Sequence, residues 1–195
     1  MNAFLWISDL LTVGAWGLYL LAQWKGRIQA SSVNCGLSAV MYVAIFLSTR
    51  SLSNLSVSAI YAINGFAVAA SFLLTFKNPS KFVKSDIPLA LVACACMSLV
   101  FKWPGAVVVI SGSYTACSFT SYVMKVRSGV VHEWFLPWAL WVAGGCAYLA
   151  GMGRVSPFVY INPIVNLVCW SAVMGFSLRA ARRTGAPQRI PVLLP

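Results

Sequence analysis

Long apolar stretches recur along almost the whole chain, and they constrain its fold more than any other feature. They cover residues 3–23, 31–49, 56–76, 87–101, 105–124, 133–152 and 156–178. A helix needs roughly 20 apolar residues to cross the hydrocarbon core of a bilayer, and most of these stretches have about that length. Hydrophobic residues make up 60% of the chain and charged residues 9%, unlike a soluble domain. We therefore predict an all-α polytopic membrane protein with seven transmembrane helices.

Basic residues gather after every second apolar stretch. The net charge is +11, and eleven of the fourteen Lys and Arg residues follow the first, third, fifth and seventh stretches. The positive-inside rule then predicts an external N-terminus and a cytoplasmic C-terminus. The basic C-terminal segment is interpreted as a topology signal that also attracts anionic headgroups. Because the basic residues form no compact platform, we do not expect nucleic-acid binding.

Residues that carry redox, metal or hydrolytic chemistry are scarce. All six cysteines fall inside apolar stretches, and no CxxC motif occurs. Cys94 and Cys96 are two residues apart, so on a helix they point in different directions and do not readily share a metal. The single histidine, His132, has only Glu133 beside it in a predicted loop. We therefore expect no metal, no cofactor and no enzymatic activity.

Two parts of the chain share a pattern of polar residues. The segment SAIYAING has the outline of SPFVYINP, with Asn64 matching Asn162 at an offset of 98 residues. The segments QWKGR and VMKVR also match, Lys25 to Lys125, at an offset of 100. Four helices separate corresponding positions, so both units run in the same direction, as a parallel repeat about an axis along the membrane normal. The predicted units are residues 1–80, a linker helix at 81–104, residues 105–180 and a basic cytoplasmic tail at 181–195.

Asparagines inside the predicted spans are the main candidate functional residues. An unpartnered amide in hydrocarbon costs several kcal/mol, so each must face another helix or a cavity. If Asn64 and Asn162 face the repeat axis, they line a pocket suited to a neutral or zwitterionic solute. Asn166 lies one turn further on the same face, and Pro163 is expected to free the carbonyl of Val159. The alternative is that these amides only hold helices together.

Three further residues have both a functional and a structural interpretation. Asp9 is the only carboxylate well inside a predicted span, as expected of a proton or cation coupling site, or else Ser8 and Asp9 cap a helix. Trp16 would stack on a solute ring or simply pack. Ser118 lies in the polar segment SGSYTACSFTSY, where hydroxyls line a wet path or bond carbonyls of their own helix.

The helix plan resembles that of two transporter families and of one further bacterial family. The resemblance rests on three segments, WISDLLTVGAWGLYLLAQWKGR, LSVSAIYAINGFAVAASFLL and NPIVNLVCWSAVMGFSLRAARR. The three–one–three layout resembles the SWEET-like sugar transporters and the PnuC-type nicotinamide riboside transporters. More closely, residues 3 to about 183 look like the YgjV family of small bacterial inner-membrane proteins. The resemblance implies a SWEET-like fold and facilitated movement of a small polar solute, although the first helix lacks a clear proline–glutamine signature.

Together these features predict a multi-pass protein of the bacterial inner membrane that moves a small polar solute. Two three-helix units would rock around a site at the middle of the membrane. The predicted solute-binding residues are Asn64, Asn162, Asn166, Trp16 and Ser118, and Asp9 is the predicted coupling acid. The predicted partners of the protein are the lipid bilayer and the solute, and the sequence leaves open whether the protein forms a homo-oligomer. The alternative function is a non-transporting membrane scaffold or accessory protein.

Overall fold

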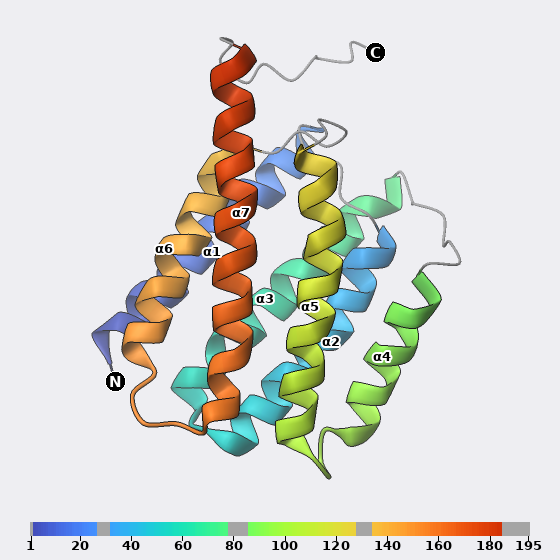
Figure 1. Ribbon diagram of the computed structural model, residues 1–195, viewed down its shortest axis with the longest axis vertical. Helices are drawn as coiled ribbons and strands as arrows, with labels where there is room; N and C mark the ends of the chain where they lie inside the picture. Colours follow the sequence, from blue (N-terminus) through green and yellow to red (C-terminus); the bar gives the residue numbers. More distant parts are fainter. Residues whose placement is uncertain (1, 27–31, 78–85, 128–133, 185–195) are drawn as a thin grey trace.

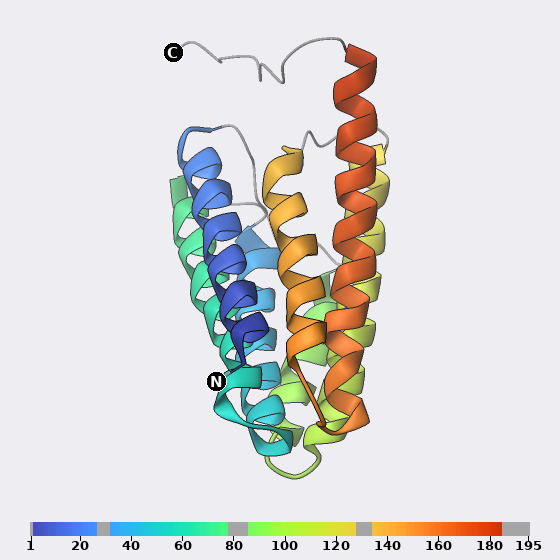
Figure 2. The ribbon, with the colours of Figure 1, turned by 90° about the vertical axis from the view of Figure 1, so that its left-hand side faces the viewer.

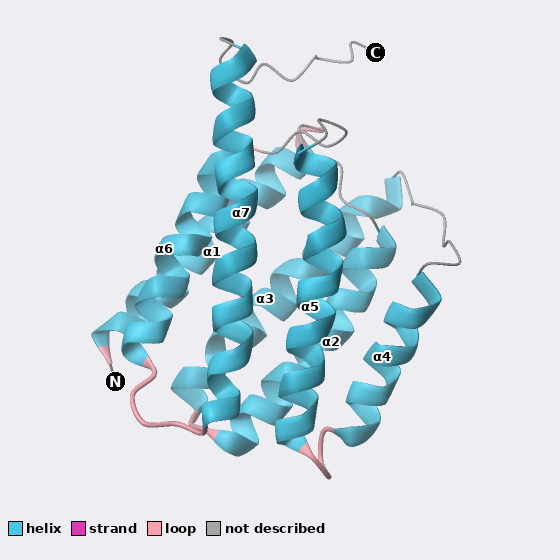
Figure 3. Ribbon diagram, viewed as in Figure 1, coloured by secondary structure: helices cyan, strands magenta, loops and turns pink. Residues whose placement is uncertain are grey.

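The protein is built from seven α-helices in the residues that the structure describes (Figure 1). The computed structural model describes residues 2–26, 32–77, 86–127 and 134–184. The helices are α1 (Ala3–Trp24), α2 (Ser32–Leu52), α3 (Leu55–Leu74), α4 (Asp86–Leu99), α5 (Pro104–Arg127), α6 (Phe135–Gly151) and α7 (Ile161–Thr184), with short 3-10 helices η1 (Thr75–Lys77) and η2 (Pro157–Tyr160). These segments contain no strand (Figure 3), which confirms the predicted all-α class for the described part of the chain.

Several helices are long and apolar enough to cross a membrane. Four candidate spans are found, at Ala3–Trp24, Cys35–Leu52, Leu55–Leu74 and Pro157–Arg179. Two shorter apolar helical segments lie at Ala90–Leu99 and Phe135–Gly151. Large apolar side chains point outward, for example Phe66, which is 79% exposed, and Phe101, which is 85% exposed. The chain is therefore compatible with a membrane protein, while the count of seven spans stays a prediction.

Six of the helices pack into a closed ring. Helix α3 packs between α1 and α2, and α7 packs between α5 and α6. The ring closes where α1 packs on α6 and where α2 packs on α5. Helix α4 lies outside this ring, against α2 and α5 (Figure 1). Consecutive helices alternate in direction, so the four odd-numbered helices run the same way (Figures 1 and 2).

Local signals explain where several helices begin. Asn2 caps α1 by accepting a hydrogen bond from the Phe4 amide at 3.0 Å. Asn54 caps α3 in the same way, accepting from the Val57 amide at 2.9 Å. Side-chain oxygens of this kind satisfy the amides that a helix start leaves without a partner.

Helix α7 begins later than its apolar stretch suggests. Residues Pro157–Tyr160 form a 3-10 turn, and the α-helix starts at Ile161, which places Pro163 in its first turn. Proline is tolerated there because an amide in the first turn has no helical acceptor to lose. Pro163 therefore lies at the start of α7 and does not interrupt it, and the expectation that it frees the Val159 carbonyl stays a prediction. The proline instead marks the change from 3-10 to α geometry.

Small residues bring α1 and α6 unusually close together. The buried face of α1 contains Leu5, Ser8 and Thr12, and α6 presents Gly144 and Gly151 to it. A Cβ atom on Gly151 would lie 2.9 Å from Leu5 Cγ and 3.0 Å from the Leu5 backbone nitrogen. A Cβ on Gly144 would lie 3.4 Å from the Ser8 carbonyl and from Thr12 Oγ1. Glycines thus let the two helix backbones approach, as small residues do in membrane helix pairs.

Candidate functional site

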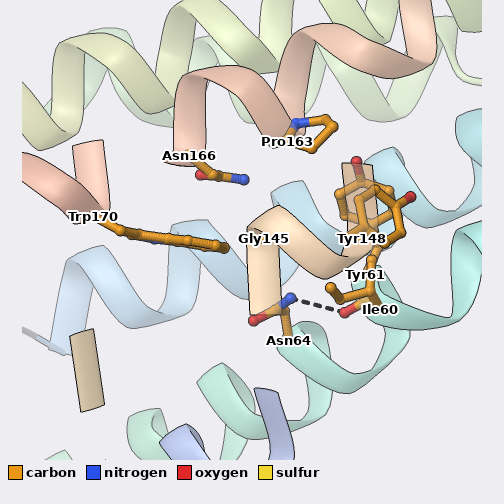
Figure 4. Close-up of a pocket in the computed structure, with 8 residues that line it drawn as sticks. All are labelled: Ile60, Tyr61, Asn64, Gly145, Tyr148, Pro163, Asn166 and Trp170. Atoms are coloured by element: carbon orange, nitrogen blue, oxygen red, sulfur yellow. Dashed lines mark hydrogen bonds between the residues drawn. The ribbon is translucent and has the colours of Figure 1, made fainter. Parts of the chain in front are cut away.

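A small cavity lies between α3, α6 and α7, and polar side chains line part of it (Figure 4). Its lining residues are Ile60, Tyr61, Asn64, Gly145, Tyr148, Pro163, Asn166 and Trp170. We call it the amide cavity. Its volume of about 20 Å³ is enough for about one water molecule. In this conformation it therefore holds no room for a solute with several heavy atoms.

Two polar atoms in the lining of the amide cavity have no hydrogen-bond partner within the described residues, the Tyr61 hydroxyl and Oδ1 of Asn166. Asn166 is the one that the sequence predicts as a ligand. Its side chain is only 6% exposed, yet its Oδ1 atom accepts no hydrogen bond within the described residues. A buried carbonyl without a partner costs roughly 1–3 kcal/mol. Water or a bound molecule that donates a hydrogen bond would remove that cost. Figure 4 shows this carboxamide on the opposite side of the Gly145 segment from Asn64.

Asn64 lines the same cavity, but part of its amide is already used. Its Nδ2 donates to the Ile60 carbonyl at 2.8 Å, and its Oδ1 accepts from Trp16 Nε1 at 2.7 Å. An amide has two donors and two acceptor positions, so Asn64 keeps one of each. Trp16 was expected to stack on a solute or to pack. The structure confirms packing, since the Trp16 ring lies 5.0 Å from that of Trp141, and it adds a further role, as a hydrogen-bond donor that joins α1 to α3.

Asn162 does not reach the amide cavity. Its side chain is 1% exposed, and Nδ2 donates to Ser111 Oγ at 2.8 Å and to the Val108 carbonyl at 3.3 Å. These contacts hold α7 on α5. The expected facing pair of Asn64 and Asn162 is therefore absent, and Asn166, one turn along α7, lies opposite Asn64 instead.

Two tyrosines close one end of the amide cavity. The Tyr148 hydroxyl on α6 donates to the Val57 carbonyl on α3 at 2.5 Å, in a buried contact. The rings of Tyr61 and Tyr148 meet edge to face with centroids 6.2 Å apart. Sequence reasoning missed both tyrosines. Tyr61 carried a usable signal, because it lies three residues before Asn64 and so shares its helix face.

Tryptophans from three helices form a packed aromatic cluster beside the cavity. The Trp16 and Trp141 rings are 5.0 Å apart, and the Trp138 and Trp141 rings are 4.8 Å apart. Trp141 stacks on Trp170 with centroids 6.2 Å apart, and Trp170 itself lines the cavity. These separations are those of attractive aromatic pairs. The cluster thus forms an apolar wall against the amides.

A second small cavity lies between α2 and α5. Its volume is about 30 Å³, and its lining residues are Ser38, Met41, Tyr42, Ile45, Tyr114, Thr115, Ser118 and Phe119. We call it the hydroxyl cavity. Ser118 belongs to this lining and does not share a cavity with the asparagines. Its Oγ donates to the Thr115 carbonyl at 3.2 Å, so it also bonds its own helix as the alternative interpretation held.

Asp9 lies inside α1 and lines neither cavity. It is half-buried, in the second turn of a helix that begins at Ala3 and is capped by Asn2. The alternative in which Ser8 and Asp9 cap this helix is therefore wrong. A coupling role for Asp9 stays a prediction.

The described segments contain no candidate metal site. No group of three or more His, Cys, Asp or Glu residues that could hold a metal occurs among them. His132 and Glu133, and most of the basic tail, lie outside the described residues.

No protein-family model, curated protein or solved structure matches the chain. The resemblance to the YgjV, SWEET and PnuC families therefore stays a prediction.

Proposed function

We propose that the protein is an integral membrane transporter or facilitator of a small polar solute. The observation that supports this most directly is the amide cavity, where Asn64 from α3 and Asn166 from α7 lie opposite each other inside a helix ring. Asn166 is the better ligand of the two, because its carbonyl has no partner within the described residues. The proposed location is the bacterial inner membrane, with the N-terminus outside and the C-terminus in the cytoplasm.

The proposed mechanism is alternating access between two three-helix units, α1–α3 and α5–α7, with α4 as the linker. The packing order supports such a repeat: α3 lies between α1 and α2 as α7 lies between α5 and α6. Tyr61 and Asn64 line the amide cavity as Pro163 and Asn166 do, so the proposed repeat offset near the site is 102 residues and not 98. That shift of four residues is about one helical turn.

The cavity has room for only about one water molecule, so transport needs a relative movement of the units. The hydrogen bond from Tyr148 to Val57 and the contact between Tyr148 and Tyr61 join the two units on one side. Breaking one hydrogen bond and one ring contact costs about 1–3 kcal/mol, which thermal fluctuation or a bound solute can supply. The proposed site would thus open by rocking one unit against the other, as repeats do in other carriers.

The test is solute uptake into proteoliposomes that contain the purified protein. Asn166→Ala and Asn64→Ala should each lower uptake, with Asn166→Ala the more severe. Asn162→Ala is the matched control, because it removes a buried amide of the same helix that lies outside the cavity. Equal uptake by the wild type, Asn64→Ala and Asn166→Ala would contradict the proposal.

Coupling is tested separately with Asp9→Asn. Asp9 is the only carboxylate in the candidate spans, and such residues commonly carry protons or cations. If Asp9 couples transport to a proton gradient, Asp9→Asn should keep downhill uptake and lose uptake driven by the gradient. A variant that still concentrates solute would remove Asp9 from the mechanism.

A non-transporting scaffold is the second candidate, and two contacts favour it. The Trp16–Asn64 bond joins α1 to α3, and the Asn162–Ser111 bond joins α7 to α5. Both are interhelical bonds of the kind that stabilises membrane bundles. This function predicts that Asn64→Ala and Asn162→Ala lower the unfolding temperature equally and that neither changes the movement of any solute.

A further inference from the structure

The amide cavity and the hydroxyl cavity lie at one level of the helix ring. Asn64 lines the first cavity and Gly65 follows it on α3, where a Cβ atom would lie 3.4 Å from Tyr42 Cβ. Tyr42 belongs to α2 and lines the second cavity. Gly65, the residue after Asn64, thus contacts a lining residue of the hydroxyl cavity at the same level of the ring.

The two cavities also share a wall of packed side chains. Ile45 lines the hydroxyl cavity, whereas Ile60 and Tyr61 line the amide cavity. All three belong to one buried cluster, and Tyr42 packs against that cluster. Side chains change rotamer far more readily than helices part, so such a wall can open without unfolding the ring.

Neither cavity contains a charged residue in its lining. The amide cavity offers carboxamides and tyrosine hydroxyls, and the hydroxyl cavity offers serine, threonine and tyrosine hydroxyls. These groups can replace the hydrogen bonds of an uncharged solute with water. An ion would lose its hydration without gaining an opposite charge, which is far more costly. The linings therefore favour solutes without formal charges.

We propose that the two cavities are the two ends of a single binding site for an uncharged, hydrogen-bonding solute. This rests on the proposed transport function and narrows its substrate class, because a zwitterion is excluded along with ions. Asn166 and Trp170 form the amide end, and Ser38 and Ser118 on facing helices form the hydroxyl end. Movement of Tyr42 and Tyr61 joins them. In the present conformation the amide end holds about 20 Å³, room for about one water molecule, and the hydroxyl end holds about 30 Å³, room for about two.

The experiment measures solute entry into proteoliposomes by stopped-flow light scattering, with glycerol and erythritol as uncharged probes and glycine as a zwitterion of similar size. Ser118→Leu fills the hydroxyl end, and Asn166→Ala alters the amide end. Thr120→Leu is the matched control, because Thr120 is an exposed hydroxyl residue two positions away on α5 whose hydroxyl donates to the Ala116 carbonyl of its own helix. Ser38→Val tests the same end from α2, in case Ser118→Leu fails to fold.

A single site predicts that Ser118→Leu and Asn166→Ala each slow erythritol entry by about tenfold, the effect of one lost hydrogen bond or a blocked path. Thr120→Leu should leave entry unchanged, and glycine should enter no faster than into empty liposomes. If Asn166→Ala slows solute entry but Ser118→Leu and Ser38→Val do not, the transport function stands and the single site is overturned. Glycine entry as fast as erythritol entry would overturn the restriction to uncharged solutes. No entry of any probe through the wild type would contradict both proposals.

Discussion

The helix ring closes in two different ways at its two junctions. Where α1 meets α6, Gly144 and Gly151 bring the backbones together, and neither cavity lies between them. Where α2 meets α5, free space of about 30 Å³ remains beside Ser38 and Ser118. The α1–α6 junction has no room for an added methyl group at Gly151, whereas the α2–α5 junction keeps free volume.

This difference indicates how the two halves of the ring can move. A close-packed junction resists sliding, because any shift brings backbone atoms into contact. A junction with free space and hydroxyl groups can rearrange its side chains and rebond them at small cost. We therefore expect α1 and α6 to act as the pivot, and α2 and α5 to separate or approach. Adding or removing single groups at each junction tests this expectation.

The largest effect is expected from Gly151→Ala at the tight junction. The new methyl would lie 2.9 Å from Leu5 Cγ and 3.0 Å from the Leu5 nitrogen, so α1 must move away. Overpacking of this kind should lower the free energy of unfolding by about 2–3 kcal/mol, measured by denaturant titration in micelles. Gly17→Ala on α1 is the control, because no atom lies within 4 Å of its Cβ position. It should be neutral or stabilising by about 0.5–1 kcal/mol, since alanine favours helix.

A smaller effect is expected from Asn2→Ala, which acts on the end of the same junction. Asn2 caps α1, and its Nδ2 also donates to the Gly151 carbonyl at 2.9 Å. Asn54→Ala is the matched control, because Asn54 caps α3 and has no bond to another helix among the described residues. Each variant should lose about 1 kcal/mol for its cap, and Asn2→Ala should lose about 0.5–1.5 kcal/mol more. Equal losses would mean that the bond to Gly151 does not hold α1 on α6.

Much of the fold follows from local composition and was therefore accessible from the sequence. The first apolar stretch predicts residues 3–23, and α1 runs over Ala3–Trp24. The third predicts 56–76, and α3 runs over Leu55–Leu74. The length and apolar content of a helix are properties of its own residues, so no knowledge of its neighbours is needed.

The site depended on packing that local composition does not encode. Asn162 and Asn166 are four residues apart, so they differ by only about 40° around the helix and look alike on a helical projection. Which one lines the amide cavity depends on how α7 is rotated and positioned against its neighbours, which its own residues do not encode. Tyr148 could not be identified for a similar reason. Its hydroxyl acts through the Val57 carbonyl, 91 positions away in the chain.

The smallest effect is expected from Ser118→Thr at the loose junction. This change adds one methyl group, as Gly151→Ala does, but beside a cavity of about 30 Å³. The hydroxyl can still donate to the Thr115 carbonyl, as Ser118 does at 3.2 Å. Threonine loses little in a helix, so the free energy of unfolding should change by less than about 0.5 kcal/mol in the same micelle titration. If Ser118→Thr lowers the free energy of unfolding as much as Gly151→Ala does, the two junctions are equally tightly packed. That result would contradict the expectation that α1 and α6 act as the pivot.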